Sequence, residues 1–207
     1  MPDQFIIHLP PAAAAPCRQL WQQYGFAFRV VKPRRTRLGD FRRWPDGRTQ
    51  ITVNANLNPY AFLITYVHEV AHADVNRMHT PKGRGRRVPP HGKVWQTAFQ
   101  RLMQPFLTEA IFPAEILQPL RQYMAKPAAT TYASPALMLA LRQFDPVPAQ
   151  ATIPNATLLR DVPEGGLFQF AKKTYQRGTM RRTRVVCKEV SSGKSYAILA
   201  HALVEKQ

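Results

Sequence analysis

Cysteine is scarce in this chain of 207 residues: only Cys17 and Cys187 occur, far apart and with no Cys-x-x-Cys pair. A zinc ribbon built on four cysteines is therefore excluded, and both thiols are expected to be free, as in a reducing cytosol. No apolar run approaches the roughly 18 residues that a membrane-spanning helix requires. The N-terminal residues are a poor secretory signal because prolines and an acidic residue interrupt them. The sequence predicts a cytoplasmic protein, with association to the nucleoid left open and no membrane partner.

Acidic residues are also few. The chain has 12 Asp and Glu against 29 Lys and Arg, and its formal net charge is +17. A charge of this size attracts polyanions, of which DNA and RNA are the usual ones. The basic residues cluster in three segments, 32–43, 82–87 and 172–184. The residues predicted to contact nucleic acid are Arg34, Arg35, Arg37, Arg42, Arg43, Lys82, Arg84, Arg86, Arg87, Lys172, Lys173, Arg181, Arg182 and Arg184.

The length and a hydrophobic fraction of 45% are enough for one substantial core with a small appendage. Residues 1–126 are expected to form the main domain. Residues 127–163 contain six prolines and no glycine, which predicts a linker that carries one short helix. Residues 164–207 are expected to form a small basic β unit.

The local patterns predict a series of elements. Asn58 and Pro59 form a good N-cap and first-turn pair for the second helix. Ile51 and Val53 alternate with polar neighbours, as in a half-buried strand. Helices are expected at 16–24, at 58–79, from about 91 to 103, at 114–124, where Pro119 should kink or shorten the helix, and at 135–144. Strands are expected at 26–43, 48–54, 167–170, 182–190 and 195–199, with turns at 45–47 and 192–193.

The segment HEVAH at 68–72 carries the strongest chemical signal. The chain has six histidines and six glutamates, so chance placement of His-Glu-x-x-His has a probability of roughly 0.005. On a helix, positions i and i+4 share a face, so His68 and His72 can both bind one ion. Glu69 lies about 100° further round, where it can accept the proton of a metal-bound water without being a ligand.

A catalytic zinc usually has three protein ligands, so a third one is needed. The extended HExxHxxGxxH motif is excluded because position 75 is Val and position 78 is Met. Glu109 and Glu115 are available further along the chain. His91 is the better candidate, because it follows two prolines, precedes Gly92 and opens an amphipathic helix that can pack against the first one.

The segment His68-Glu69-Val70-Ala71-His72, followed by His91-Gly92-Lys93-Val94-Trp95, resembles the SprT-like zinc metalloprotease family of the SprT/Spartan type. The resemblance covers roughly residues 16–106 and includes the strand ITVNANLN, and RTRVVCKEVSSGKSYAI is similar to the tail of bacterial members. It implies Zn²⁺ held by His68, His72 and His91, with Glu69 as general base. The implied fold is α+β and zincin-like: a small antiparallel sheet, the HExxH helix and flanking helices, followed by a small C-terminal β unit.

The family also implies a function, namely a zinc endopeptidase stimulated by DNA that cleaves DNA-bound or DNA-crosslinked proteins. A monomer is expected, and single-stranded and duplex DNA both remain open. Unlike many family members, this chain has no cysteines for a zinc ribbon. Two alternatives remain. Metal-dependent nucleases of the rRNA-maturation type use a HxxxHxxxxxH spacing that fits less well, and a nucleic-acid-binding module with structural zinc would leave Glu69 without a role.

Overall fold

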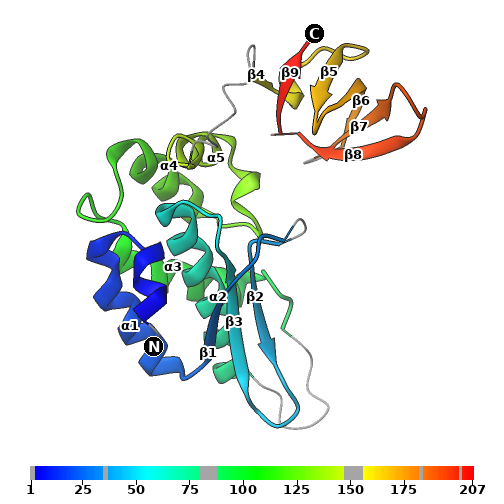
Figure 1. The fold of residues 1–207 in the computed structure, drawn as a ribbon. Helices are drawn as coiled ribbons and strands as arrows, with labels where there is room; N and C mark the ends of the chain where they lie inside the picture. Colours follow the sequence, from blue (N-terminus) through cyan, green and yellow to red (C-terminus); the bar gives the residue numbers. More distant parts are fainter. Residues whose placement is uncertain (1–2, 35–36, 80–87, 147–155, 182–183, 201) are drawn as a thin grey trace. The chain divides into compact units, whose positions relative to one another are not determined.

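The computed structural model describes residues 3–34, 37–79, 88–146, 156–181, 184–200 and 202–207. The chain forms two compact units, residues 1–146 and 147–207, and each has its own hydrophobic core. The fold class is α+β, with helices and a small sheet in the first unit and a larger sheet in the second (Figure 1). The segment 127–163, expected to be a linker, is shared between the units, because its helix packs into the first and its last residues begin the second.

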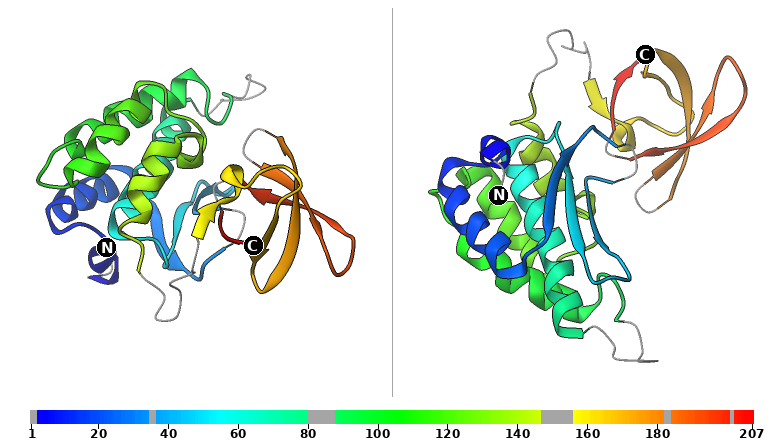
Figure 2. Two further views of the ribbon diagram at one scale, coloured as in Figure 1. Left: turned by 90° about the horizontal axis from the view of Figure 1, so that it is seen from above. Right: turned by 60° about the horizontal axis from the view of Figure 1, so that its bottom comes forward.

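In the first unit, helices cover one face of a three-stranded sheet (Figure 2). That face contributes Phe28, Ile51 and Val53 to the core. The elements of this unit are α1 (Ala14–Tyr24), β1 (Ala27–Val31), β2 (Gly39–Arg43), β3 (Thr49–Asn54), α2 (Pro59–His79), α3 (Lys93–Met103), α4 (Ala114–Ala125) and α5 (Pro135–Arg142), with short 3-10 turns at Asp3–His8, Pro11–Ala13, Gln104–Phe106 and Thr131–Ala133.

The sheet differs from the expected one in two ways. It is mixed rather than antiparallel, because β1 runs parallel to β3 while β2 runs antiparallel to it, in the order β1-β3-β2. The single strand predicted at 26–43 is two strands, since the chain leaves the sheet after Val31 and returns at Gly39. Pro33 lacks a backbone donor for a ladder, and the buried Asn54 holds the excursion by donating from Nδ2 to the carbonyl of Arg37 at 2.9 Å.

Helix α2 is the central helix of the first unit, as its apolar sequence predicts. Asn58 caps it, with Oδ1 accepting from the backbone N–H groups of Tyr60 at 3.1 Å and Ala61 at 2.9 Å. The helix packs against α1, α3, β2 and β3, and most of the side chains from Phe62 to Ala73 are buried. Burial on nearly all sides fixes the rotation of α2 and therefore the direction in which each of its polar side chains points.

Two further local predictions are resolved by the structure. Helix α1 ends at Gly25, which caps its C-terminus in the left-handed conformation (φ 64°) that glycine commonly adopts there. Helix α4 runs through Pro119 to Ala125, so proline does not shorten it.

The second unit is a six-stranded sheet in the order β4-β9-β5-β6-β7-β8, with antiparallel pairing throughout the described strands. Its core is built around Phe168, Tyr175, Val185 and Cys187. The strands are β4 (Ala156–Leu158), β5 (Leu167–Phe170), β6 (Lys173–Arg181), β7 (Arg184–Glu189), β8 (Ser195–Leu199) and β9 (Leu203–Lys206), with a short 3-10 turn at Leu159–Asp161.

Strands β6 and β9 were not expected from the sequence. In β6 the only buried side chain among the described residues is that of Tyr175, so the strand has almost no apolar alternation. Its pairing with β7 is also irregular between Arg177 and Met180. Gly178 lies in this bulge, where a Cβ would be 2.7 Å from the carbonyl oxygen of Val186, so a side chain there would have to displace backbone.

Candidate metal centre

Three histidines meet at one point, and two helices bring them there. His68 and His72 lie one turn apart on α2, and His91 lies in the turn that precedes α3. The Nε2 atoms are 3.3 Å apart for His68 and His72, 3.1 Å for His72 and His91, and 3.2 Å for His68 and His91. We call this arrangement the histidine triangle. Among the described residues it is the one group of His, Cys, Asp and Glu side chains close enough to hold a metal ion.

The edges of the histidine triangle fit tetrahedral coordination. For metal–nitrogen bonds of about 2.0–2.1 Å at tetrahedral angles, adjacent ligand nitrogens are about 3.3–3.4 Å apart. The observed edges of 3.1–3.3 Å lie within a few tenths of an ångström of this spacing. Three imidazole ligands leave a fourth position of a tetrahedral ion for water or substrate, as catalytic zinc sites require.

Hydrogen bonding alone does not satisfy this arrangement. A neutral imidazole Nε2 is either a donor or an acceptor, so two of three mutually contacting nitrogens must be of the same kind. At least one edge of the triangle is then repulsive, whereas a cation accepts all three lone pairs. The three residues therefore form a better metal site than a hydrogen-bonded cluster.

The ionisation of the histidines also suits a metal. Burial lowers the pKa of His68 well below its usual value, and the neighbouring His72 and His91 lower it further. Burial and then His91 lower the pKa of His72 to about 4, and burial lowers that of His91. All three rings are therefore neutral at neutral pH, which is the form that binds a metal.

Trp95 fixes the orientation of the three rings. It is fully buried on α3, and its ring centroid lies 4.6 Å from that of His68, 5.6 Å from that of His72 and 4.8 Å from that of His91. Its indole N–H points to the carbonyl oxygen of His68 at 3.4 Å. Trp95 stands in the first turn of α3, shortly after His91, so its position in the sequence could have suggested this role.

Glu69 is buried next to the histidine triangle on the side of α2 that faces β2. Its side chain is 6% exposed, and its carboxylate accepts a hydrogen bond from the backbone N–H of Phe41. It is not a member of the metal-binding group, in agreement with a role other than ligand. β2 is an edge strand of the sheet, so this hydrogen bond uses a backbone group that no described strand pairs with.

The surroundings of Glu69 favour its neutral form. Burial, followed by the charge of Asp40, raises its pKa to about 8, while the Phe41 N–H, Arg34 and Arg37 act in the opposite direction. A cation in the histidine triangle would lower this pKa by direct attraction. The pKa of Glu69 therefore depends on groups from one distant segment of the chain, residues 34–41. No local pattern in the sequence links Asp40 to Glu69.

Gly39 makes room for the Glu69 side chain. A Cβ at this position would be 2.5 Å from Oε1 of Glu69 and 2.8 Å from Cγ2 of Thr65. No sequence signal marked this residue as part of the site. The close approach of β2 to α2 at this point is possible only with glycine.

We expect Gly39→Ala to displace the Glu69 carboxylate while leaving the metal ligands in place. Overpacking of this kind costs about 1–3 kcal/mol of stability. Bound metal, measured by elemental analysis, should stay unchanged, and any hydrolytic activity should fall by roughly tenfold or more. Arg48→Ala, at an exposed position in the turn before β3, is the control and should change neither. Full activity in Gly39→Ala would show that the position of Glu69 is not critical.

The other candidate ligands lie elsewhere. Glu109 and Glu115 are exposed and do not belong to the metal-binding group. His79 is exposed at the end of α2, and His8 stacks on Phe62 with ring centroids 5.0 Å apart. Of the candidates for the third ligand, the structure brings only His91 to His68 and His72.

The first basic cluster is largely occupied by contacts within the protein. Arg34 donates from Nε to Oδ1 of Asn54 at 2.9 Å, and Arg37 pairs with Asp40 at 2.6 Å. Arg42 lies over the ring of Trp44, 5.8 Å from its centroid, and Arg43 is exposed on β2.

In the third cluster, Lys173 pairs with Glu189 at 2.5 Å. Lys172 is exposed just before β6, and Arg181 and Arg184 are exposed at the facing ends of β6 and β7. The remaining predicted contacts lie outside the described residues: Arg35, Lys82, Arg84, Arg86, Arg87 and Arg182.

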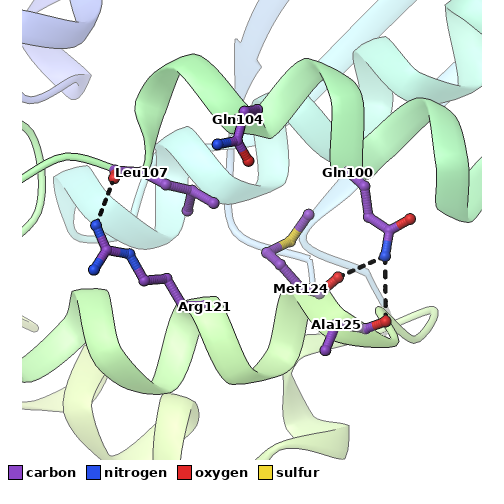
Figure 3. Close-up of a pocket in the computed structure, with 6 residues that line it drawn as sticks. All are labelled: Gln100, Gln104, Leu107, Arg121, Met124 and Ala125. Atoms are coloured by element: carbon purple, nitrogen blue, oxygen red, sulfur yellow. Dashed lines mark hydrogen bonds between the residues drawn. The ribbon is translucent and has the colours of Figure 1, made fainter.

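Two pockets in the first unit lie apart from the histidine triangle. One, of about 500 Å³, lies between α3 and α4 (Figure 3). There Arg121 donates a hydrogen bond to the carbonyl of Leu107, and Gln100 donates to the carbonyls of Met124 and Ala125. The other, of about 630 Å³, lies between the end of α1, α2 and α3, and its polar wall is the Tyr24–Asp74–Arg101 group. No residue of the histidine triangle lines either pocket.

Fold and site together define an α+β protein in which three histidines, two of them on an HExxH helix, are close enough to hold a metal ion. No protein-family model matches the chain, and comparisons with curated proteins and with solved structures find no match. Among the described residues, no helix is long and apolar enough to cross a membrane.

Proposed function

We propose that this chain is a zinc-dependent endopeptidase of the SprT-like type that acts on proteins bound or crosslinked to DNA and is stimulated by DNA. The observation that carries the proposal is the histidine triangle with the buried Glu69 at the adjacent helix position. The resemblance of the two motifs to the SprT-like family supports the same assignment. The following paragraphs give the chemical arguments.

Zinc is the metal that best suits these ligands. Three neutral imidazoles at tetrahedral spacing, without carboxylates, disfavour Mg²⁺ and Ca²⁺, which require oxygen ligands. When bound, zinc would polarise a substrate carbonyl and lower the pKa of a coordinated water towards 7.

Glu69 is the residue that can move the proton. As a carboxylate it accepts the proton of the attacking water, and in its buried setting the protonated form is also stable. It can therefore hold the proton and pass it to the departing amine of the peptide. The Phe41 N–H and the absence of a side chain at Gly39 fix where this carboxylate lies.

A peptide substrate is supported by the edge strand beside Glu69. β2 has no strand partner on its outer side among the described residues, so an extended peptide could pair with outer backbone groups other than the Phe41 N–H, which Glu69 uses. A nuclease would have less use for such an edge. The net charge of +17 supports DNA as the second partner, because it favours association with polyanions.

The proposal is tested by removing and restoring the metal. Chelator-treated protein should lose cleavage of a DNA-bound protein substrate by at least ~100-fold, and one equivalent of Zn²⁺ should restore it. The same substrate protein should be cleaved more slowly when DNA is left out of the reaction. A nuclease would instead cut the nucleic acid, and a module with structural zinc would cut neither substrate. Either of these results would overturn the proposal.

A further inference from the structure

The charged side chains on the outward face of strands β6, β7 and β8 are all basic among the described residues. In β7 the side chains of Val185, Cys187 and Glu189 are buried, so Arg184 and Lys188 point to the opposite side. Directly paired residues of antiparallel strands share a face, and therefore Arg181, which pairs with Arg184, lies on that side too. We call the surface formed by Arg181, Arg184 and Lys188 the hairpin face. Its other described members are uncharged: Gln176, Val186, Ser195, Ala197 and Leu199.

The hairpin face has no carboxylate to balance its charge. The second unit contains four acidic residues, all within its described part. Three of them pair with other cations: Asp161 with Arg160 at 3.4 Å, Glu164 with Arg177 at 3.2 Å and Glu189 with Lys173 at 2.5 Å. The fourth, Glu205, lies on β9, which is separated from β6 by β5.

The pair Arg181 and Arg184 is unfavourable for the free protein. Like charges directly opposite each other on neighbouring strands destabilise a sheet. Arg184 donates from Nη1 to the carbonyl oxygen of Ala197 at 3.0 Å, which holds its guanidinium on the hairpin face. An anion between the two arginines would remove the repulsion and gain two charge-assisted hydrogen bonds.

The spacing of the cations indicates a polymer rather than a small anion. The Cβ atoms of Arg181 and Arg184 are about 5 Å apart across the strands, so the two guanidinium groups can bind one phosphate together. Lys188 lies four residues along β7 from Arg184, or about 14 Å at the rise of an extended strand. A single phosphate cannot reach both ends, whereas a chain of phosphates can.

The hairpin face also offers no surface for stacking bases. The exposed Tyr196 pairs with Cys187 and lies on the opposite face, with its ring 5.8 Å from that of Tyr175. Recognition of single strands depends on such aromatic platforms, while a duplex presents two rows of phosphates and can be held by its backbone alone.

We propose that the hairpin face binds the phosphate backbone of duplex DNA without reading its sequence. The choice of DNA rests on the proposed function. The second unit then supplies the DNA contact, whereas three of the described arginines of the first cluster are occupied by Asn54, Asp40 and Trp44.

The test measures DNA binding separately from catalysis. Full-length protein carrying Glu69→Gln is titrated with labelled duplex DNA at several salt concentrations, alone and with Arg181→Gln, Arg184→Gln and Lys188→Gln together. The triple variant loses two phosphate contacts, one shared by Arg181 and Arg184 and one at Lys188. The log–log salt slope should therefore become shallower by about 1.8, and affinity should fall at least ~10-fold near 0.1 M salt. The control is a triple variant with Gln at Arg18, Arg48 and Lys126, which removes the same charge at exposed positions of the first unit.

The control should retain the wild-type slope and affinity, and the hairpin variant should melt at or above the temperature of its parent. Equal losses in both triple variants would reduce the effect to net charge and overturn the proposal. So would wild-type binding by the hairpin variant, or tighter binding of its parent to single-stranded DNA, duplex RNA or anionic vesicles than to duplex DNA. Since no cleavage is measured, failure of the proposed peptidase activity would leave these results standing.

Discussion

Glu69→Gln is expected to reduce peptide hydrolysis by at least ~100-fold while zinc content and melting temperature remain close to those of the wild type. Glutamine keeps the size of the side chain and can still fit beside Gly39, but it cannot take a proton from water. Replacing a buried carboxyl group whose pKa is raised by burial also carries no large desolvation cost. The measurement is initial rates on a DNA-bound protein substrate, with metal determined on the same preparation.

Glu115→Gln is the matched control, because Glu115 is an exposed glutamate near the start of α4. It should leave the rate unchanged. If Glu69→Gln retained wild-type hydrolysis, Glu69 would not be the base, or the activity would belong to a contaminant. If it lost zinc as well, the residue would be needed for the metal site rather than for proton transfer.

His91→Ala is expected to lose most of the zinc, from about one ion per chain in the wild type, and so are His68→Ala and His72→Ala. Removing one corner of the histidine triangle leaves only two imidazoles at the required spacing. Added zinc should also raise the melting temperature of the wild type, because a free zinc concentration of 100 times Kd stabilises the folded state by about 2.7 kcal/mol. The melting temperatures of the variants should not rise. Elemental analysis and thermal melts with and without added zinc provide the two readouts.

The control for this series is His79→Ala, which removes an exposed histidine from the end of the helix that carries His68 and His72. Its zinc content should equal that of the wild type. Full zinc retention by His91→Ala would remove His91 from the site. Glu109 and Glu115 would not be ready substitutes, because both are exposed and lie outside the metal-binding group.

The histidine triangle was predictable from the sequence because its parts are set by short-range rules. The spacing of His68 and His72 follows from helix geometry, and Asn58 marks where that helix begins. His91 could be selected because it opens a second amphipathic helix, and α3 does pack against α2. These contacts depend on periodicity and capping, which a single sequence displays.

The surroundings of Glu69 were not predictable, because they depend on pairing between distant strands. The predicted continuous strand at 26–43 does not include the excursion after Val31 that brings β2 alongside α2. It therefore does not place Gly39 and Asp40 next to Glu69. The excursion between β1 and β2 depends on Asn54, more than 15 residues further along the chain. In the second unit, β6 was missed because Lys173 and Arg177 lie on the same side of the strand as the buried Tyr175, where they pair with Glu189 and Glu164. The strand therefore lacks the usual apolar alternation.

The attachment of α5 decides which fragments of this chain are useful. The side-chain amide of Asn58 donates to the carbonyl of Leu141 at 2.8 Å and to Asp145 at 2.7 Å, and the rings of Tyr60 and Phe144 pack 5.0 Å apart. An expression fragment that stops at residue 126 would lack these partners. The buried side-chain amide at the start of α2 would then be left without its hydrogen bonds, at a cost of about 1–3 kcal/mol of stability. A fragment that ends at residue 146 retains every one of these contacts and is the shorter piece worth crystallising.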